Sequence, residues 1–133
     1  MTQANIADPE AAFIEWLGTE ISPLEIHADV DTDAAFVRAY RAGGITDPGT
    51  YLDHPQLVVS CFGATPPSET PKHTVATTAL DALARALDMK GRTVAGCVVT
   101  DVIVVNGLQS LPEPDGRWHY QFTVQLTTHP VRS

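Results

Sequence analysis

The spacing of hydrophobic and polar residues predicts a chain that opens with a helix. Asp8 can cap a helix, Pro9 suits the first helical position, and Glu10 favours the positive helix end. The apolar residues that follow recur at helical spacing: Phe13, Ile14, Trp16, Leu17 and Ile21. We therefore predict a helix over residues 9–17, ended by Gly18 or by Ser22-Pro23.

The next third of the chain has the pattern of strands and turns. Residues 24–28 alternate between apolar and polar, which predicts a short edge strand before an acidic loop at Asp29, Asp31 and Asp33. Residues 35–41 are rich in strand-forming side chains, and we expect Gly43-Gly44 to stop that strand. Residues 45–55 contain a turn signature and are predicted to be a loop, with a second strand over residues 56–62.

A proline-rich connector over residues 64–71 precedes the longest helical pattern. Thr70 is the expected cap, Pro71 the expected first residue, and Gly91 the expected end. The helix has a wide apolar face: Val75, Ala79, Leu80, Leu83, Ala86 and Leu87.

The last third predicts two strands around a loop. Residues 93–105 are almost continuously apolar, which is typical of a central strand covered on both faces. Residues 106–116 are predicted to be a polar loop. Residues 117–127 then alternate strictly, with one face formed by Trp118, Tyr120, Phe122, Val124 and Leu126.

These patterns predict a single α+β domain. Strands occur in pairs around one long helix, so we expect a mostly antiparallel sheet of about four to five strands with two helices packed on one face. Residues 1–33 form the N-terminal helix and edge segment, and residues 34–131 form the core.

Charge divides the chain at the same place. The sequence has 16 acids and 8 bases, a formal charge of −8. Residues 1–33 hold eight of the acids and no lysine or arginine, so the remainder is formally neutral. A low pI without a basic cluster argues against binding of nucleic acid backbones. The sequence has no run of about 18 apolar residues that could span a membrane. The N-terminal stretch MTQANIADPE lacks the basic and apolar segments of a signal peptide, so we expect no membrane partner.

The candidate chemical motifs are weak. His54, Cys61, Cys97 and His119 have the right atoms for zinc, but their spacing fits no short-range pattern, and both cysteines lie in apolar runs. Ser60 lacks the flanking glycines of the Gly-x-Ser-x-Gly motif that exposes a nucleophilic serine at a strand end. The aspartates of the acidic loop lack the glycine and glutamate of a calcium loop. We expect no catalytic residue, metal or cofactor, and hence no enzyme.

Two blocks carry a resemblance to a known family: FVRAYRAGGITDPGTYLDHPQLVVSCFGAT and the alanine-rich TPKHTVATTALDALARAL. They are similar to the tail terminator proteins of long-tailed (siphovirus-type) bacteriophages, in particular those of actinobacteria. Arg41, Gly43 and Gly44 match the Arg-x-Gly-Gly at the end of a strand, and Asp53 matches an aspartate before the next strand. Phe62, Ala64 and Thr65 match the Phe-x-Ala-Thr that follows. The resemblance covers residues 36–131, with a longer proline-rich connector and an N-terminal segment that does not align.

The resemblance implies a structural virion protein of the tail and neck, assembled in the host cytoplasm. Family members form a homohexameric ring that ends the tail tube. The implied partners are other copies of the chain, the tail tube protein and the head-completion or stopper protein of the neck. Genome DNA passes through the lumen without specific binding.

The alternatives are another neck component, such as a head-closure or tail-completion protein, and two functions of other classes. One is a small enzyme or ligand-binding domain with a pocket lined by Trp118, Tyr120 and Phe122 and with His27 or Asp101 as a base. The other is a cellular module that recruits basic partners through residues 1–33. For the ring, the expected interface residues come from loops and strand edges: Arg41, Gly43, Gly44, Asp53, Asn106 and Arg117. We also expect Phe13 and Leu17 to pack on the domain while the eight N-terminal acids line the lumen or a ring face.

Overall fold

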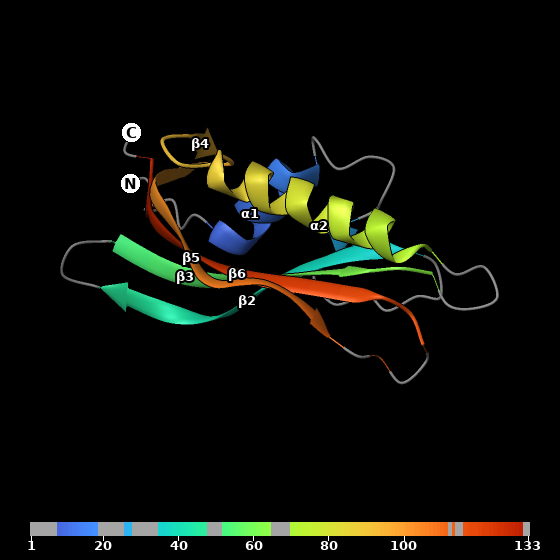
Figure 1. Ribbon diagram of the computed structural model, residues 1–133. Helices are drawn as coiled ribbons and strands as arrows, with labels where there is room; N and C mark the ends of the chain where they lie inside the picture. Colours follow the sequence, from blue (N-terminus) through green and yellow to red (C-terminus); the bar gives the residue numbers. More distant parts are fainter. Residues whose placement is uncertain are drawn as a thin grey trace.

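The computed structural model describes residues 8–18, 26–27, 35–47, 52–64, 70–111, 113 and 116–131. Two helices lie on one face of a curved sheet (Figure 1). In chain order the elements are α1 (Pro9–Gly18), β1 (Ile26–His27), β2 (Phe36–Asp47), β3 (Leu52–Phe62), α2 (Lys72–Leu87), β4 (Thr93–Val94), β5 (Cys97–Leu111) and β6 (His119–Pro130).

The sheet has the strand order β1-β2-β3-β6-β5-β4. The four long strands β2, β3, β6 and β5 pair with one another in antiparallel fashion. The two-residue β1 pairs with β2 in parallel. The structure therefore confirms the predicted α+β fold, with a mostly antiparallel sheet in a single small domain. The short β1 lies at an edge, as the alternation over residues 24–28 predicts.

The first hairpin corrects the prediction that Gly43-Gly44 ends a strand. β2 continues through both glycines to Asp47, and β3 already begins at Leu52, so residues 45–55 are mostly strand and not loop. The pairing slips by one residue between Arg41 and Gly43, which is a β-bulge. Gly44 has φ +107°, and a Cβ atom there would overlap the backbone oxygen of His54. The second glycine is therefore required by the bulge and by a close backbone approach.

The second hairpin corrects two further predictions. The apolar run over residues 93–105 is broken by a tight turn at Ala95 and Gly96, where φ is +50° and +78°. β5 then runs to Leu111, through half of the predicted loop over residues 106–116. β5 is also not central, because only the two-residue β4 lies beyond it in the sheet. It is not covered on both faces either, since residues 103–107 are exposed.

Both helices begin close to their predicted starts and α1 ends at Gly18 as predicted, but α2 ends at Leu87, before the predicted end at Gly91, and its N-cap differs. Asp8 Oδ1 accepts hydrogen bonds from the backbone N–H groups of Glu10 (3.0 Å) and Ala11 (3.2 Å), which is the predicted cap of α1. Pro71, not Thr70, occupies the N-cap position of α2. The Thr70 hydroxyl instead accepts a hydrogen bond from the backbone N–H of Ala64 (2.8 Å).

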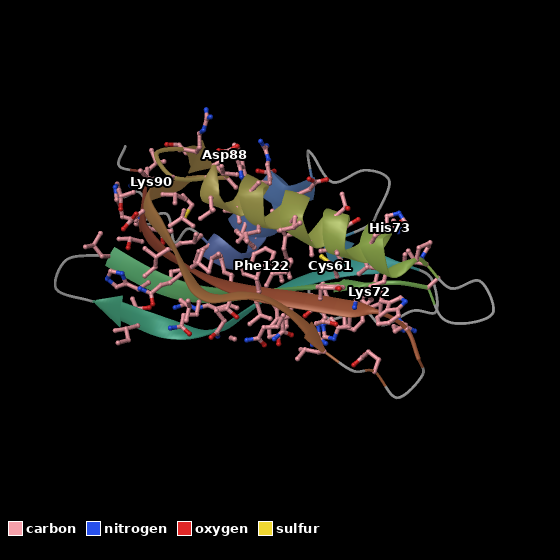
Figure 2. All side chains as sticks on the ribbon, in the orientation of Figure 1. Cys61, Lys72, His73, Asp88, Lys90 and Phe122 are labelled. Carbon is pink, nitrogen blue, oxygen red and sulfur yellow. The ribbon has the colours of Figure 1, made fainter. Side chains whose placement is uncertain are left out.

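The core lies between the sheet and the helices. Phe13 and Leu17 of α1 are fully buried there, as their spacing predicts, and Phe122 of β6 is 1% exposed. Figure 2 shows Cys61 and Phe122 between the sheet and α2. The two helices are joined at Trp16, whose indole Nε1–H donates to the Arg85 carbonyl oxygen (2.7 Å) while the Arg85 guanidinium lies 3.5 Å from the ring centroid.

Candidate interface surface

Four of the six expected interface residues come together in the β2–β3 hairpin. Arg41 Nη1 and Nη2 each donate a 2.7 Å hydrogen bond to a different carboxylate oxygen of Asp53. Arg41 Nε also donates to the Gly43 carbonyl oxygen (3.0 Å), and the Thr46 hydroxyl donates to Asp53 (2.9 Å). The bidentate pair spans the bulge, so it fixes the shape of the hairpin at the point where the ladder is irregular.

The pair has a direct electrostatic consequence. Burial by itself would raise the pKa of Asp53, but hydrogen bonds from Arg41 and Thr46 and the charge of Arg41 outweigh it and hold that pKa below the usual value of 3.8. Asp53 is therefore a carboxylate throughout the neutral range. Arg41 and Asp53 neutralise each other within one chain, which was not expected for two independent interface residues.

Glu10 of α1 occupies one position on the outer edge of β2. The backbone N–H of Arg41 donates to Glu10 Oε2 (2.8 Å). Asp8 caps α1, so two of the N-terminal acids have partners inside the chain. This limits the expectation that all eight acids line a lumen. Of the others, Glu15 is described and exposed, and five lie outside the described residues: Glu20, Glu25, Asp29, Asp31 and Asp33.

Beyond the bulge, the edge of β2 is exposed. Ile45 is 74% exposed, the largest value among the exposed large hydrophobic residues of the described chain. Ala42, Gly43 and Gly44 beside it are also exposed. β1 pairs only with Val37 and Arg38, so among the described residues no strand pairs with β2 at this level.

Asn106 lies on the opposite edge of the sheet, in β5, next to a second apolar stretch. Ile103, Val104 and Val105 are 48%, 43% and 41% exposed. β4 pairs with β5 only at Cys97 and Val98, so the edge from residue 100 onward has no strand partner among the described residues. Sequence reasoning missed this surface because it placed the valine-rich run in the middle of the sheet.

Arg117 does not lie on the surface. It is only 5% exposed and approaches two stacked aromatic rings, at 5.9 Å from the Phe36 centroid and 5.8 Å from that of Phe62. The Phe36 and Phe62 rings stack at 4.7 Å, and Phe62 stacks on His119 at 4.1 Å. The burial argues against Arg117 as a contact residue and gives it a role in packing.

His119, which stacks on Phe62, is buried without a hydrogen-bond partner in the described part of the chain. Glu113 Oε2 lies 3.6 Å from Nδ1 of its ring. Burial lowers the pKa of His119 below 6.5, the Arg117 charge lowers it further, and Glu113 opposes both. A shallow hollow of about 360 Å³ opens beside it, lined by Ser110, Leu111, Glu113, Gly116, Arg117 and Trp118.

The thiols have the properties of core residues. Cys61 and Cys97 are both free and buried, and burial raises the pKa of Cys61 to about 12 and that of Cys97 in the same direction. Thiols held in the protonated form are poor ligands and nucleophiles. Over the residues that the structure describes, no three histidine, cysteine or acidic side chains are grouped to hold a metal ion.

The pocket suggested for a ligand-binding function does not lie where it was expected. Phe122 is part of the packed core, and Asp101 forms an ion pair with Lys90 (3.5 Å). The side chain of His27 lies outside the described residues. Trp118 borders the hollow just before the start of β6, and Phe122 is not among the residues that line it.

Comparison with known proteins gives no family. No family model and no curated protein matches the chain.

Neither described helix has the length and apolar character needed to cross a membrane.

Proposed function

We propose that this chain is a structural virion protein that forms a ring at the head-proximal end of a phage tail tube. Its partners in this proposal are other copies of itself, the tube protein and the head-completion protein of the neck, and DNA passes through the ring without specific binding. The observation that carries the proposal is the coincidence of two features. The resemblance to tail terminators over residues 36–131 begins at β2, and the sheet from β2 to β5 has exposed apolar residues at both ends.

The position of the exposed residues supports assembly over catalysis. A sheet edge with unpaired backbone groups is a template for another chain, and monomeric proteins usually protect such edges. Here Ile45 is exposed on β2 at one edge of the sheet, and Ile103, Val104 and Val105 are exposed on β5 near the other edge. Surfaces at opposite ends of one subunit associate head to tail, and this arrangement closes into a ring when the rotation between subunits allows it.

The state of the reactive side chains and the net charge give further support. Among the described residues, several side chains that could take part in chemistry are paired or buried: Asp53 pairs with Arg41, Asp101 pairs with Lys90, and the two cysteines lie in the core. The net charge of −8 also suits a channel through which DNA passes, because like charge disfavours adsorption of phosphate.

Native mass spectrometry over a wide range of concentration tests the proposal. A ring protein gives a hexameric mass, and negative-stain images then show six-fold rings with a central hole. A monomeric mass at every concentration, including in mixtures with the tube protein, would falsify it. A gene for a tube protein next to the gene of this chain is the genomic arrangement that the proposal predicts.

A further inference from the structure

We propose that the edge of β2 over residues 43–45 in one copy pairs antiparallel with the edge of β5 over residues 101–103 in the next. The partner is thus a second copy of this chain. The inference rests on the proposed ring and assigns the surface that builds it. It starts from the register of the sheet, in which the two exposed edges lie at the same level.

The cross-strand pairs define rows that run from one edge to the other. Gly43 pairs with Gln56, Gln56 with Gln125, and Gln125 with Ile103. The neighbouring row starts two residues earlier in β2 and links Arg41 to Val104 through Leu57 and Val124. Continuing these rows into a second copy without a shift brings Ile103 of one chain beside Gly43 of the other.

The order of strand directions favours this head-to-tail arrangement. β2, β3, β6 and β5 alternate in direction, so β2 and β5 at the two ends run opposite ways. When a second copy continues the sheet in the same orientation, its β2 is antiparallel to the β5 that it meets. The alternation then passes through the boundary unbroken, and each contact leaves one new open edge for the next copy.

The side chains at the two edges fit each other in size. A Cβ atom built on Gly43 meets nothing within 4 Å, so the β2 edge has free space at this level. Ile103 and Val104 on the β5 edge are large, apolar and half-exposed. Ile45 lies two residues from Gly43 and therefore on the same face of the sheet as Ile103, as a diagonal neighbour across the boundary.

The contact contains one charged residue, and it has a partner in its own chain. The β2 edge from Ala42 to Thr46 has no charged residue, and β5 has none from Val102 to Leu111. Asp101, which the register places opposite Ile45, forms an ion pair with Lys90 (3.5 Å). Arg41, which flanks the β2 edge, already has both of its terminal nitrogens on Asp53. Drying the boundary therefore leaves no unpaired charge, which is the largest cost that an interface can incur.

The bulges of the two strands limit the pairing to short segments. In β5 the register shifts on either side of Asp101–Val104, leaving these four residues as its regular outer stretch. In β2 the shift lies just before Gly43, and Glu10 already binds the Arg41 N–H. The regular stretch of each edge is thus short and begins at a bulge, which restricts the register of the contact.

Cysteine cross-linking in the full chain tests this inference. The variant Ile45→Cys/Ile103→Cys is treated with a short bismaleimide, and the products are separated by denaturing electrophoresis. We expect a ladder of covalent multiples that ends at the hexamer. The matched control Ile45→Cys/Ala84→Cys uses an exposed position on α2 and should give no ladder. The wild-type chain, whose two cysteines are buried, sets the background.

The single variants identify the orientation. Ile45→Cys mixed with Ile103→Cys should give a dimer that neither gives alone. A dimer of Ile103→Cys with itself indicates pairing of β5 with β5 and overturns the inference. As a second readout, Ile103→Lys places an ammonium in the boundary and should raise the concentration needed for assembly by about tenfold or more.

The outcomes separate this inference from the proposed function. A hexameric native mass without the ladder overturns the edge pairing and leaves the ring in place. A ladder that continues beyond the hexamer supports the edge pairing and overturns the closed ring. A monomer at all concentrations overturns both.

Discussion

The ion pair between Arg41 and Asp53 should couple the two strands of the β2–β3 hairpin energetically. Each of its two hydrogen bonds is 2.7 Å long, and the side chains are 28% and 20% exposed. Hydrogen bonds to charged groups contribute about 1.5–3 kcal/mol, whereas fully exposed ion pairs contribute about 0.2–1 kcal/mol. Because this pair is only partly exposed, we expect a coupling free energy of about 1–2 kcal/mol.

A double-mutant cycle measures that coupling. The free energy of unfolding in urea is compared for the wild type, Arg41→Ala, Asp53→Ala and the double variant, at a concentration where all four have the same mass. Non-additivity of about 1–2 kcal/mol at pH 7 is expected, since the two residues contact each other directly. Thr74→Ala with Asp81→Ala, two exposed positions on α2 seven residues apart, is a matched control that should be additive.

The pH dependence of the cycle gives an independent check. The pKa of Asp53 is lower in the folded chain than its usual 3.8, so the unfolded state binds a proton first as the pH falls. The stabilisation is therefore fully present above the unfolded pKa and is lost as the pH falls through the folded one. A coupling below about 0.3 kcal/mol at pH 7, or one that persists when Asp53 is protonated, contradicts the reasoning.

Three further predictions concern the core, the bulge and the buried histidine. Phe122→Ala should cost about 3–5 kcal/mol in urea unfolding, and a loss under about 1 kcal/mol would show that the core is not packed at this ring. Gly44→Ala should destabilise by more than about 1 kcal/mol because of its positive φ, while Gly18→Ala, which meets nothing, should not; equal effects would contradict the bulge. His119 has a lowered pKa, so the unfolded state takes up its proton first and stability should decrease as the pH falls below 6.5. Replacing His119 with glutamine should flatten that part of the pH profile, and an unchanged slope would assign it to another group.

The elements that sequence predicted well are those specified by local rules. Asp8-Pro9-Glu10 begins α1 because a cap, a fixed φ and a favourable charge act within one turn. The strict alternation in residues 117–127 predicted β6, where Phe122 is buried and Gln121 is not. Both signals involve only residues that are close in sequence, so one amino-acid sequence is enough to identify these elements.

The errors occur where tertiary pairing overrides a local signal. Gly43 and Gly44 normally end a strand, but β3 pairs with β2 on both sides of them and absorbs the irregularity as a bulge. The turn at Ala95 and Gly96 lies within an apolar run and has no proline or asparagine to mark it. The prediction of a central strand is therefore wrong for β5, whose valines at positions 104 and 105 are exposed near a sheet edge.

The candidate surface was predicted in part. The residues of the β2–β3 hairpin were predicted as interface residues. Their mutual ion pair was not, because it depends on the pairing of β2 with β3, which sequence spacing does not reveal. Arg117 was expected at the subunit or neck interface, but it is buried beside aromatic rings from β2 and β3. The acidic loop at residues 29–33 lies outside the described residues.

The function proposed here is tested most directly at the end of a growing tail tube. Tail tube protein is assembled in the presence of this chain carrying a gold-labelled affinity tag, and the tubes are imaged by electron microscopy. The account predicts label at a single end of each tube and tubes that stop growing once labelled. Label spread along the tubes, or tubes that bear no label and lengthen as if the chain were absent, would contradict it.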